Sequence, residues 1–215
     1  MTENTNPLGK YYRQPQIYIT LPSKGKYYGA DVFTPSETGE VPVLPMTAKD
    51  ELSFKTPDAM MSGQSTVDVI QSCVPNFKNA WKMVNFDTDA VLLAIRIATY
   101  GETMEINFNV PGANESVAHT VNLPAILDQI QKTKVDTAFT LKDGLKITVQ
   151  PLTYRDMTST SLQTFQQQKM YSAVQDSELP DEDKAKRFND AFAKLTELNS
   201  SILLKNMASI TMTDG

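Results

Sequence analysis

The segment Asp87–Tyr100 constrains the fold more than any other part of the chain. Its apolar residues fall on almost every face of a helix, and they are Val91, Leu92, Leu93, Ile95, Ile97 and Ala98. Gly101 follows directly, where helices commonly end with a glycine. A helix that is apolar all round is buried in a folded protein. We therefore predict a central core helix here, around which the rest of the chain packs.

The residues before this helix predict a small antiparallel β unit followed by short helices. Alternating apolar and polar residues predict strands at 16–21 and 41–46. The second strand is irregular or at an edge, because Pro42 and Pro45 have no backbone N–H to donate. Helices are predicted at residues 47–54, 57–61 and 65–74. The first of them has a capping-box start at Thr47 with Asp50 three residues later.

The residues after the core helix predict β-hairpins and then a helical hairpin. Strands are predicted at residues 102–110, 117–121, 137–141 and 145–149, with a loop at 111–114, and helices at 124–130, 153–174 and from 181 onward. The predicted fold class is α+β, with an N-terminal antiparallel β unit, a buried central helix, middle β-hairpins and a C-terminal helical hairpin. Its parts are a flexible arm at 1–15, an α+β core at 16–152 and a helical hairpin at 153–215.

The composition excludes several classes of protein. The 215 residues carry a net charge of −5, so we expect no nucleic-acid partner, because such proteins usually show a basic stripe. Cys73 and His119 are the only cysteine and histidine, which excludes an internal disulfide and a zinc site of several thiolates or imidazoles. The sequence contains no run of about 18 apolar residues, so no membrane span is predicted. The polar N-terminal residues lack a secretory signal, so a cytoplasmic location is expected.

No group of residues predicts catalysis. His119 lies in a polar segment, and Cys73 lies on the apolar side of a predicted helix with no basic neighbour in sequence to lower its pKa. The turn Ser23–Lys26 follows a strand but lacks the glycine and lysine spacing of a phosphate-binding loop. We therefore predict that the chain is not an enzyme and has no cofactor and no metal site.

The order of several motifs resembles the baseplate hub subunit of T-even contractile-tailed bacteriophages. The matching segments are Ile19–Tyr28, Val41–Glu51, Lys55–Gly63, Val69–Pro75 and Asp89–Gly101. The most specific are Leu-Pro-Ser-x-Gly-x-x-Tyr and the core helix Ala-Ile-Arg-Ile-Ala-Thr-Tyr-Gly. Some members of that family carry a Cys-x-x-Cys pair after the strand that follows this helix. This chain has no cysteine at Asn107–Asn114, so the departure removes a metal site from the prediction.

The resemblance implies a structural or assembly component of the central hub of a phage tail baseplate. Its implied partners are other baseplate hub and spike proteins and, as a further candidate, the tape-measure protein. A tail assembly chaperone that is absent from the virion stays an alternative, and a small hydrolase is a more distant one.

The candidate structural or interaction residues come from the two most specific motifs. Pro22, Gly25 and Tyr28 would form the turn and anchor of the N-terminal unit. Arg96 and Tyr100 are polar members of the core helix, and the Arg96 guanidinium needs a carboxylate or a route to solvent.

Overall fold

The predicted core helix is α4 (Asn85–Tyr100), and the computed structural model around it describes residues 12–56, 61–109, 116–175 and 180–212. Its buried apolar residues are Ala90, Val91, Ala94, Ile95 and Ile97. Leu92, Leu93 and Ala98 are half-buried and pack against the same core, so the helix is covered on most sides. Residues 57–60 of the predicted helix at 57–61, the predicted loop at 111–114 and residues 1–11 of the arm at 1–15 lie outside the described residues.

The N-terminal β unit is antiparallel, as predicted, but its strands are short. β1 (Ile17–Ile19) pairs with β2 (Val41–Val43), and Tyr18 lies opposite Pro42. The pairing stops after Val43 because the backbone N–H of Leu44 donates to the carbonyl of Cys73 at 2.8 Å, and not to β1. This bond ties the β unit to the end of α3 (Gln64–Cys73).

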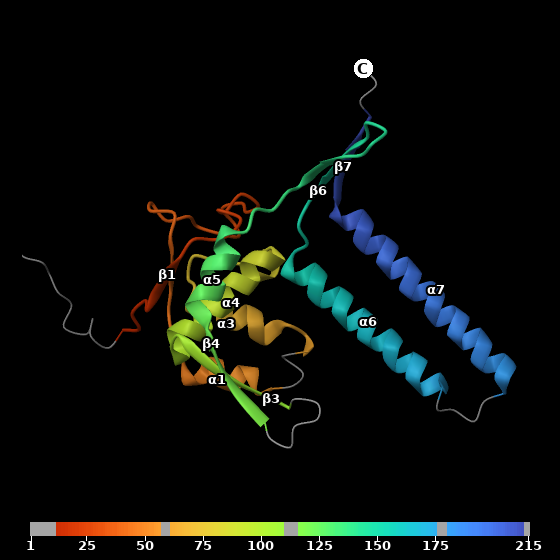
Figure 1. Cartoon of the computed structure of the whole chain (residues 1–215), viewed down its shortest axis with the longest axis horizontal. Coiled ribbons are helices and arrows are strands. Elements are labelled where there is room, and N and C mark those ends of the chain that lie inside the picture. Colours follow the sequence, from red (N-terminus) through yellow and green to blue (C-terminus); the bar gives the residue numbers. More distant parts are fainter. Residues whose placement is uncertain (1–11, 57–60, 110–115, 176–179, 213–215) are drawn as a thin grey trace, which may run out of the picture.

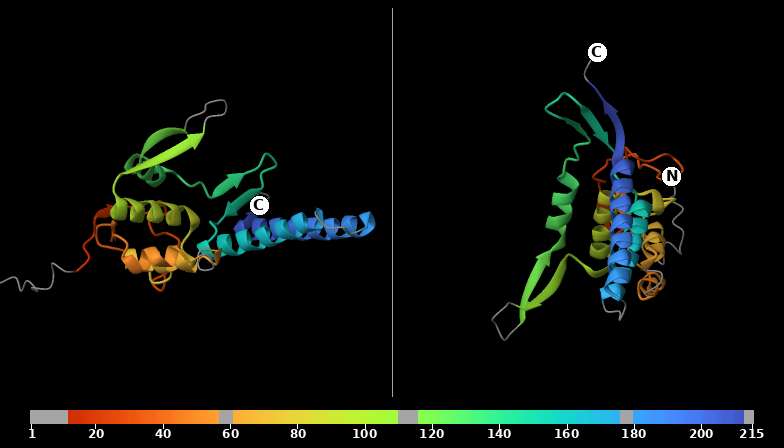
Figure 2. Two further views of the ribbon diagram at one scale, coloured as in Figure 1. Left: turned by 90° about the horizontal axis from the view of Figure 1, so that it is seen from below. Right: turned by 90° about the vertical axis from the view of Figure 1, so that its right-hand side faces the viewer.

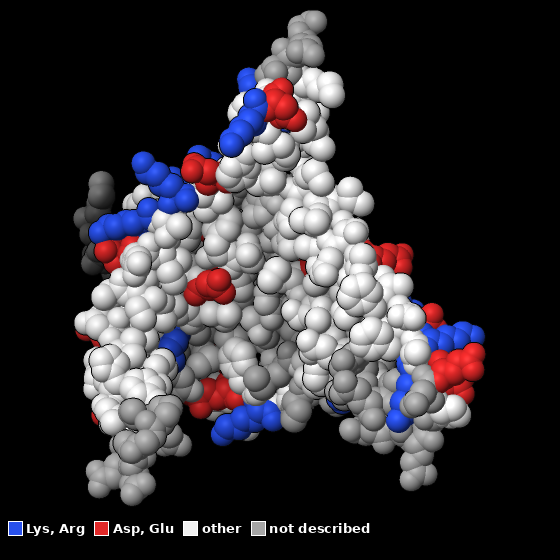
Figure 3. Space-filling model, turned by 45° about the vertical axis from the view of Figure 1, so that its right-hand side comes forward, with Lys and Arg blue, Asp and Glu red and all other residues white. Residues whose placement is uncertain are grey.

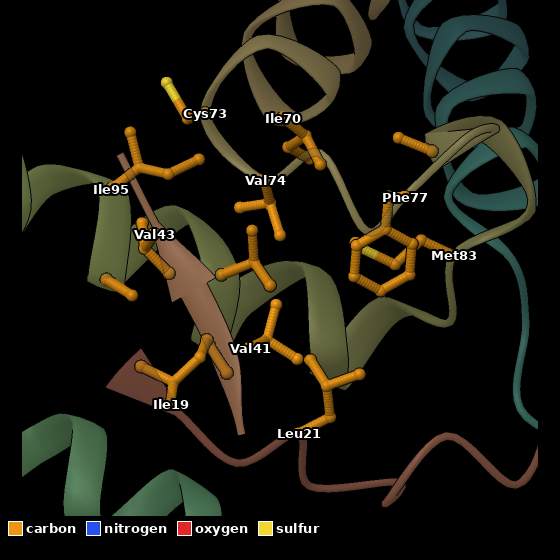
Figure 4. Packing of buried hydrophobic residues seen from close by; sticks show 14 of the residues in the cluster. Ile19, Leu21, Val41, Val43, Ile70, Cys73, Val74, Phe77, Met83 and Ile95 are labelled. Atoms are coloured by element: carbon orange, nitrogen blue, oxygen red, sulfur yellow. The ribbon is translucent and has the colours of Figure 1, made fainter. Parts of the chain in front are cut away.

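The helices around this unit begin where local chemistry places them. α1 (Ala48–Phe54) starts with the predicted capping box, in which Thr47 and Asp50 each bond the other's backbone N–H. A 3-10 turn, η2 (Ala80–Lys82), then leads from α3 toward α4. Side chains from both strands, from α3 and the segment after it, and from α4 interdigitate in one core, including Ile19, Val43, Val74, Phe77 and Ile95 (Figure 4).

The middle of the chain forms a β-hairpin and a helix. β3 (Thr103–Asn109) pairs with β4 (Ser116–Asn122) in the predicted antiparallel arrangement. α5 (Leu123–Lys132) follows at once, capped by the Asn122 side chain, which accepts from the N–H of Ala125 at 3.0 Å. Leu123 and Leu127 are buried against the core, whereas the far end of the hairpin extends away from it (Figures 1 and 2).

A small sheet includes one strand that the sequence did not predict. β5 (Ala138–Thr140) and β6 (Lys146–Val149) form the expected hairpin, and β7 (Met207–Thr211) adds to the free edge of β6. No glycine or proline separates β7 from the preceding helix, so no local signal marks the change. The strand forms because it pairs with β6, with Ile147 opposite Ile210. Since β6 lies far away in sequence, the local residues do not reveal this pairing.

The last two helices are the predicted antiparallel hairpin. α6 (Tyr154–Gln175) and α7 (Asp181–Asn206) lie side by side and extend from the core (Figures 1 and 2). Lys205 pairs with Asp156 at 3.2 Å and joins the base of α7 to the first turn of α6. Gly63, at φ +78°, lets α6 approach closely, because a Cβ there would lie 2.9 Å from Cγ2 of Thr158.

Candidate functional site

The turn after β1 is fastened to the start of α4 by a buried carboxylate. Asp87 accepts the N–H of Ser23 on Oδ1 at 2.9 Å, and the hydroxyls of Ser23 and Tyr28 on Oδ2. The Tyr28 hydroxyl is 2.6 Å from Oδ2 and itself accepts the N–H of Val84 at 3.1 Å. Asp87 is fully buried. The Leu-Pro-Ser-x-Gly-x-x-Tyr motif is therefore linked directly to the core helix.

The electrostatics of this cluster are those of a buried carboxylate with neutral donors. Burial raises the pKa of Asp87, although the hydrogen bonds from Ser23 and Tyr28 lower it in part. Burial and the neighbouring Asp87 also raise the pKa of Tyr28. No cation is among the groups that shift either pKa, so hydrogen bonds and not ion pairs hold the carboxylate in place.

The structure places Gly25 and Pro22 beside this cluster. Gly25 has φ +74°, and a Cβ there would lie 3.4 Å from the Phe33 ring, so a glycine suits both the backbone and the space. Pro22 is half-buried and lines an open groove of about 540 Å³ between this turn and the end of α5 with the residues that follow it. Lysine side chains also line the groove, and they are Lys24, Lys26, Lys132 and Lys134.

Arg96 and Tyr100 contact each other at the C-terminal end of α4. The guanidinium carbon of Arg96 lies 4.6 Å from the centre of the Tyr100 ring, a cation–π arrangement one helical turn apart. Tyr100 is 53% exposed, and desolvation, followed by the neighbouring Glu51 carboxylate, raises the pKa of its hydroxyl. One guanidinium nitrogen of Arg96, Nη1, is buried without a hydrogen-bond partner in the described structure.

A second polar anchor was not predicted from the sequence. Arg13 donates to the carbonyl of Pro45 at 2.8 Å and to the carboxylate of Asp50 at 3.4 Å, and it also bonds Ser72. The residues just before β1 are thereby held against α1 and α3. Only the folded chain brings Arg13 near Asp50, because 37 residues separate them.

The five predicted residues do not form one site. Tyr28 meets Asp87 at the start of α4, whereas Arg96 and Tyr100 lie at its other end. Ser23, Asp87 and Arg13, which sequence reasoning missed, make more of the polar contacts between elements. The sequence offered one signal for Asp87: a carboxylate in the first turn of a mostly apolar, buried helix needs hydrogen-bond partners from elsewhere in the chain.

The described residues offer little for catalysis. Burial raises the pKa of the Cys73 thiol to about 11, which suppresses the reactive thiolate. His119 is exposed on β4, with its ring centre 6.2 Å from that of Phe108. Among the described residues, His, Cys, Asp and Glu form no group suited to a metal ion, and none of the helices could span a bilayer.

The extensions from the core each expose apolar side chains. Phe108 and Val117 lie opposite each other at the far end of the β3–β4 hairpin and are 45% and 48% exposed. In the three-stranded sheet, Phe139, Ile147 and Ile210 form a row across one face. Phe139 and Ile210 are 49% and 56% exposed, whereas residues on the other face, such as Thr148 and Ser209, are polar.

The α6–α7 hairpin continues this pattern. Phe165 on α6 is 40% exposed, and Phe192 and Leu203 on α7 are 63% and 62% exposed. An antiparallel sheet or helical hairpin normally buries its apolar face, and clusters of exposed apolar side chains mark sites of contact with other molecules. A small core with such extensions has the architecture of a subunit that completes its packing within a larger assembly.

The comparisons with known proteins agree with this architecture. Residues 14–213 match the family model described as T4 bacteriophage base plate protein, and the chain therefore belongs to this family. It is a structural baseplate protein of T4-like phages, located in the tail baseplate of the virion, where it contacts other baseplate proteins. No curated protein and no solved structure matches the chain.

Proposed function

We propose that the chain is a non-enzymatic component of the central hub of the baseplate and acts through protein–protein contacts. Its direct partners would be hub and spike proteins, with the tape-measure protein as a further candidate. It would assemble with them in the host cytoplasm before it is built into the tail. The proposal rests on the apolar row of Phe139, Ile147 and Ile210 on one face of the three-stranded sheet β5–β6–β7. The exposed aromatic residues of the helical hairpin support it as well.

A binding role suits these surfaces better than a catalytic one. Contacts between proteins are dominated by a few aromatic and aliphatic residues that become desolvated in the complex. The open groove beside Pro22 is lined by lysines with one carboxylate, Asp136, and it brings together no acid and base pair. Cys73, a possible nucleophile, is buried and has a raised pKa.

The candidate residues of the two motifs would support binding indirectly. Tyr28, Gly25 and Pro22 shape the turn that is fastened to Asp87, and they would keep the N-terminal unit rigid for a partner. Arg96 and Tyr100 lie at the other end of the core helix, where Tyr100 is exposed. We propose a scaffold role for the first group and a peripheral contact for Tyr100.

The test is a pull-down of the tagged protein from cells that produce the phage, with mass spectrometry of the eluate and of purified tails. Hub and spike proteins should co-purify, and the chain should occur in tails at a fixed copy number. Binding to hub proteins without presence in tails would identify an assembly chaperone instead. Absence of baseplate proteins from the eluate would refute the hub proposal.

A further inference from the structure

The open groove beside Pro22 has a charge opposite to that of the whole chain. Its walls present four lysines and one carboxylate, which are Lys24, Lys26, Lys132, Lys134 and Asp136. The chain as a whole carries a net charge of −5. Figure 3 shows Lys and Arg side chains close together at the upper left of one face, with carboxylates beside them. A positive hollow in an acidic protein attracts anionic groups to one place on its surface.

Most of the groove lysines have no ion-pair partner within the chain. Lys132 pairs with Asp128 at 2.6 Å. None of the ion pairs between described residues includes Lys24, Lys26 or Lys134, and these three side chains are exposed. Because ammonium groups around one hollow repel one another, a carboxylate bound between them would relieve this repulsion.

The backbone at Lys24 also favours a role for its side chain. Lys24 has φ +53°, and in the described part of the chain it is the one residue other than glycine with positive φ. A lysine adopts this left-handed region at a cost that a glycine avoids. The turn therefore holds a lysine where backbone geometry alone would favour glycine or asparagine.

Both walls of the groove are fixed to the core. On one side, the N–H and the hydroxyl of Ser23 donate to the buried Asp87, and Phe86 precedes Asp87 in the first turn of α4. On the other side, the hydroxyl of Thr133 donates to the carbonyl of Gln129 at 3.0 Å and closes the last turn of α5. A preorganised groove loses less conformational freedom on binding than a mobile loop does.

We propose that this groove binds an acidic segment of another baseplate protein, an inference that rests on the proposed binding role. Carboxylates of the segment would pair with the ammonium groups of Lys24, Lys26 and Lys134. Charge complementarity of this kind guides the partner to the groove and fixes its register.

The other lining residues favour a peptide over a nucleic acid. The rings of Tyr27 and Phe86 meet edge to face, with 6.2 Å between their centres, and offer an apolar contact beside the lysines. Asp136 can accept hydrogen bonds from the N–H groups of a peptide backbone, whereas it would repel a phosphate backbone, which has no hydrogen to donate. The described lining includes no arginine, the residue whose planar fork suits phosphate.

The test is a fluorescence anisotropy titration of the purified full chain with two labelled probe peptides. The probes are Asp-Glu-Phe-Asp-Glu and its uncharged counterpart, Asn-Gln-Phe-Asn-Gln. The wild type should bind the acidic peptide at least about tenfold more tightly, and added salt should weaken this binding. The double variant Lys24→Gln with Lys134→Gln should weaken it at least about tenfold.

A second double variant controls for the change in net charge. Lys49→Gln with Lys142→Gln removes the same charge from α1 and from the turn between β5 and β6, and it should bind the acidic peptide as the wild type does. All four lysines are exposed, and circular dichroism checks that both double variants fold.

Three results would overturn the proposal. They are equal binding of the two peptides by the wild type, equal weakening in the two double variants, and tighter binding of an oligothymidylate than of the acidic peptide. The last result would assign the groove to a nucleic acid.

Pull-downs of the same variants from phage-producing cells separate this inference from the hub role. The groove variant should recover fewer baseplate proteins than the control variant. Equal recovery of hub proteins by both would refute the groove proposal and leave the hub role intact. A wild type that selects the acidic peptide but recovers no hub protein would refute the hub role and leave the preference of the groove standing.

Discussion

The hydroxyl of Tyr28 donates to the carboxylate of Asp87 at 2.6 Å, across 59 residues of sequence. This bond connects the turn after the first strand to the first turn of the core helix. The same hydroxyl accepts the N–H of Val84, so one oxygen satisfies two groups that the fold removes from water. A phenylalanine at this position would fill the same space and supply neither bond.

Tyr28→Phe should therefore destabilise the protein by about 2 kcal/mol, because it removes a hydrogen bond to a buried charged group and leaves the Val84 N–H unpaired. The measurement is urea unfolding followed by circular dichroism. Tyr27→Phe is the matched control, since Tyr27 is 41% exposed and its hydroxyl has no such role. Equal losses in the two variants would show that the Asp87 cluster contributes little.

The contrast between α4 and its anchors shows what sequence could predict. The core helix, the capping box at Thr47 and the β5–β6 hairpin depend on residues close together in sequence. The bonds of Asp87 and Arg13 and the pairing of β7 depend on contacts that only the folded chain creates. Local pattern therefore predicted the elements, whereas the polar contacts between them required the structure.

Asp50 should make stability depend on pH in the acid range. Burial raises the pKa of this carboxyl. Hydrogen bonds from Thr47 and Ser72 and the charge of Arg13 together lower the pKa by more, so the net shift is downward. A depressed pKa in the folded state means that Asp50 stabilises above its unfolded pKa of about 3.9 and loses this contribution as pH falls through the folded pKa.

Asp50→Asn should thus be less stable than the wild type at pH 7, and the difference should shrink as pH falls below about 4. Unfolding curves at a series of pH values would measure it. Asp128→Asn is the control, because its exposed pair with Lys132 contributes little. A gap between wild type and Asp50→Asn that is constant with pH would contradict the assignment.

Gly63 should be required for the approach of α6 to the core. Gly63→Ala places a side chain at positive φ and a Cβ 2.9 Å from Thr158, whereas Gly39→Ala pays only the backbone cost, because nothing lies within 4 Å there. Each alanine should cost about 1–2 kcal/mol for the left-handed backbone, and Gly63→Ala should cost more. The free energies of unfolding of both variants, measured with denaturant, separate the cost of the left-handed backbone from the cost of the contact with Thr158.

A double variant tests the named contact. Thr158→Ala should recover part of the stability lost in Gly63→Ala, because it removes both side-chain atoms of Thr158 that crowd the new Cβ. If the stability losses of Gly63→Ala and Thr158→Ala simply add in the double variant, Thr158 is not the side chain that collides with the new Cβ.

Cys73 should be inert to thiol reagents in the folded protein. Its side chain is fully buried, and its pKa is raised to about 11, so little thiolate exists at pH 8. Labelling by a chromogenic disulfide should occur only when denaturant unfolds the chain. The exposed Ser201→Cys variant provides a rapidly labelled control, and equally rapid labelling of the wild type would show that α3 opens at the site.

The face of the three-stranded sheet that presents Phe139, Ile147 and Ile210 should contribute to partner binding and little to the stability of the fold. Ile210 is 56% exposed and completes the row with Ile147 and Phe139, so Ile210→Lys should leave the unfolding curve almost unchanged. Because a lysine in a desolvated interface leaves an unpaired charge, the variant should recover baseplate partners at least about tenfold less efficiently. Quantitative mass spectrometry of pull-downs from phage-producing cells measures this recovery. Ser209→Lys, on the same strand but the opposite face, is the matched control and should bind normally. If the two lysine variants lose partners equally, charge on the strand and not the apolar row explains the loss.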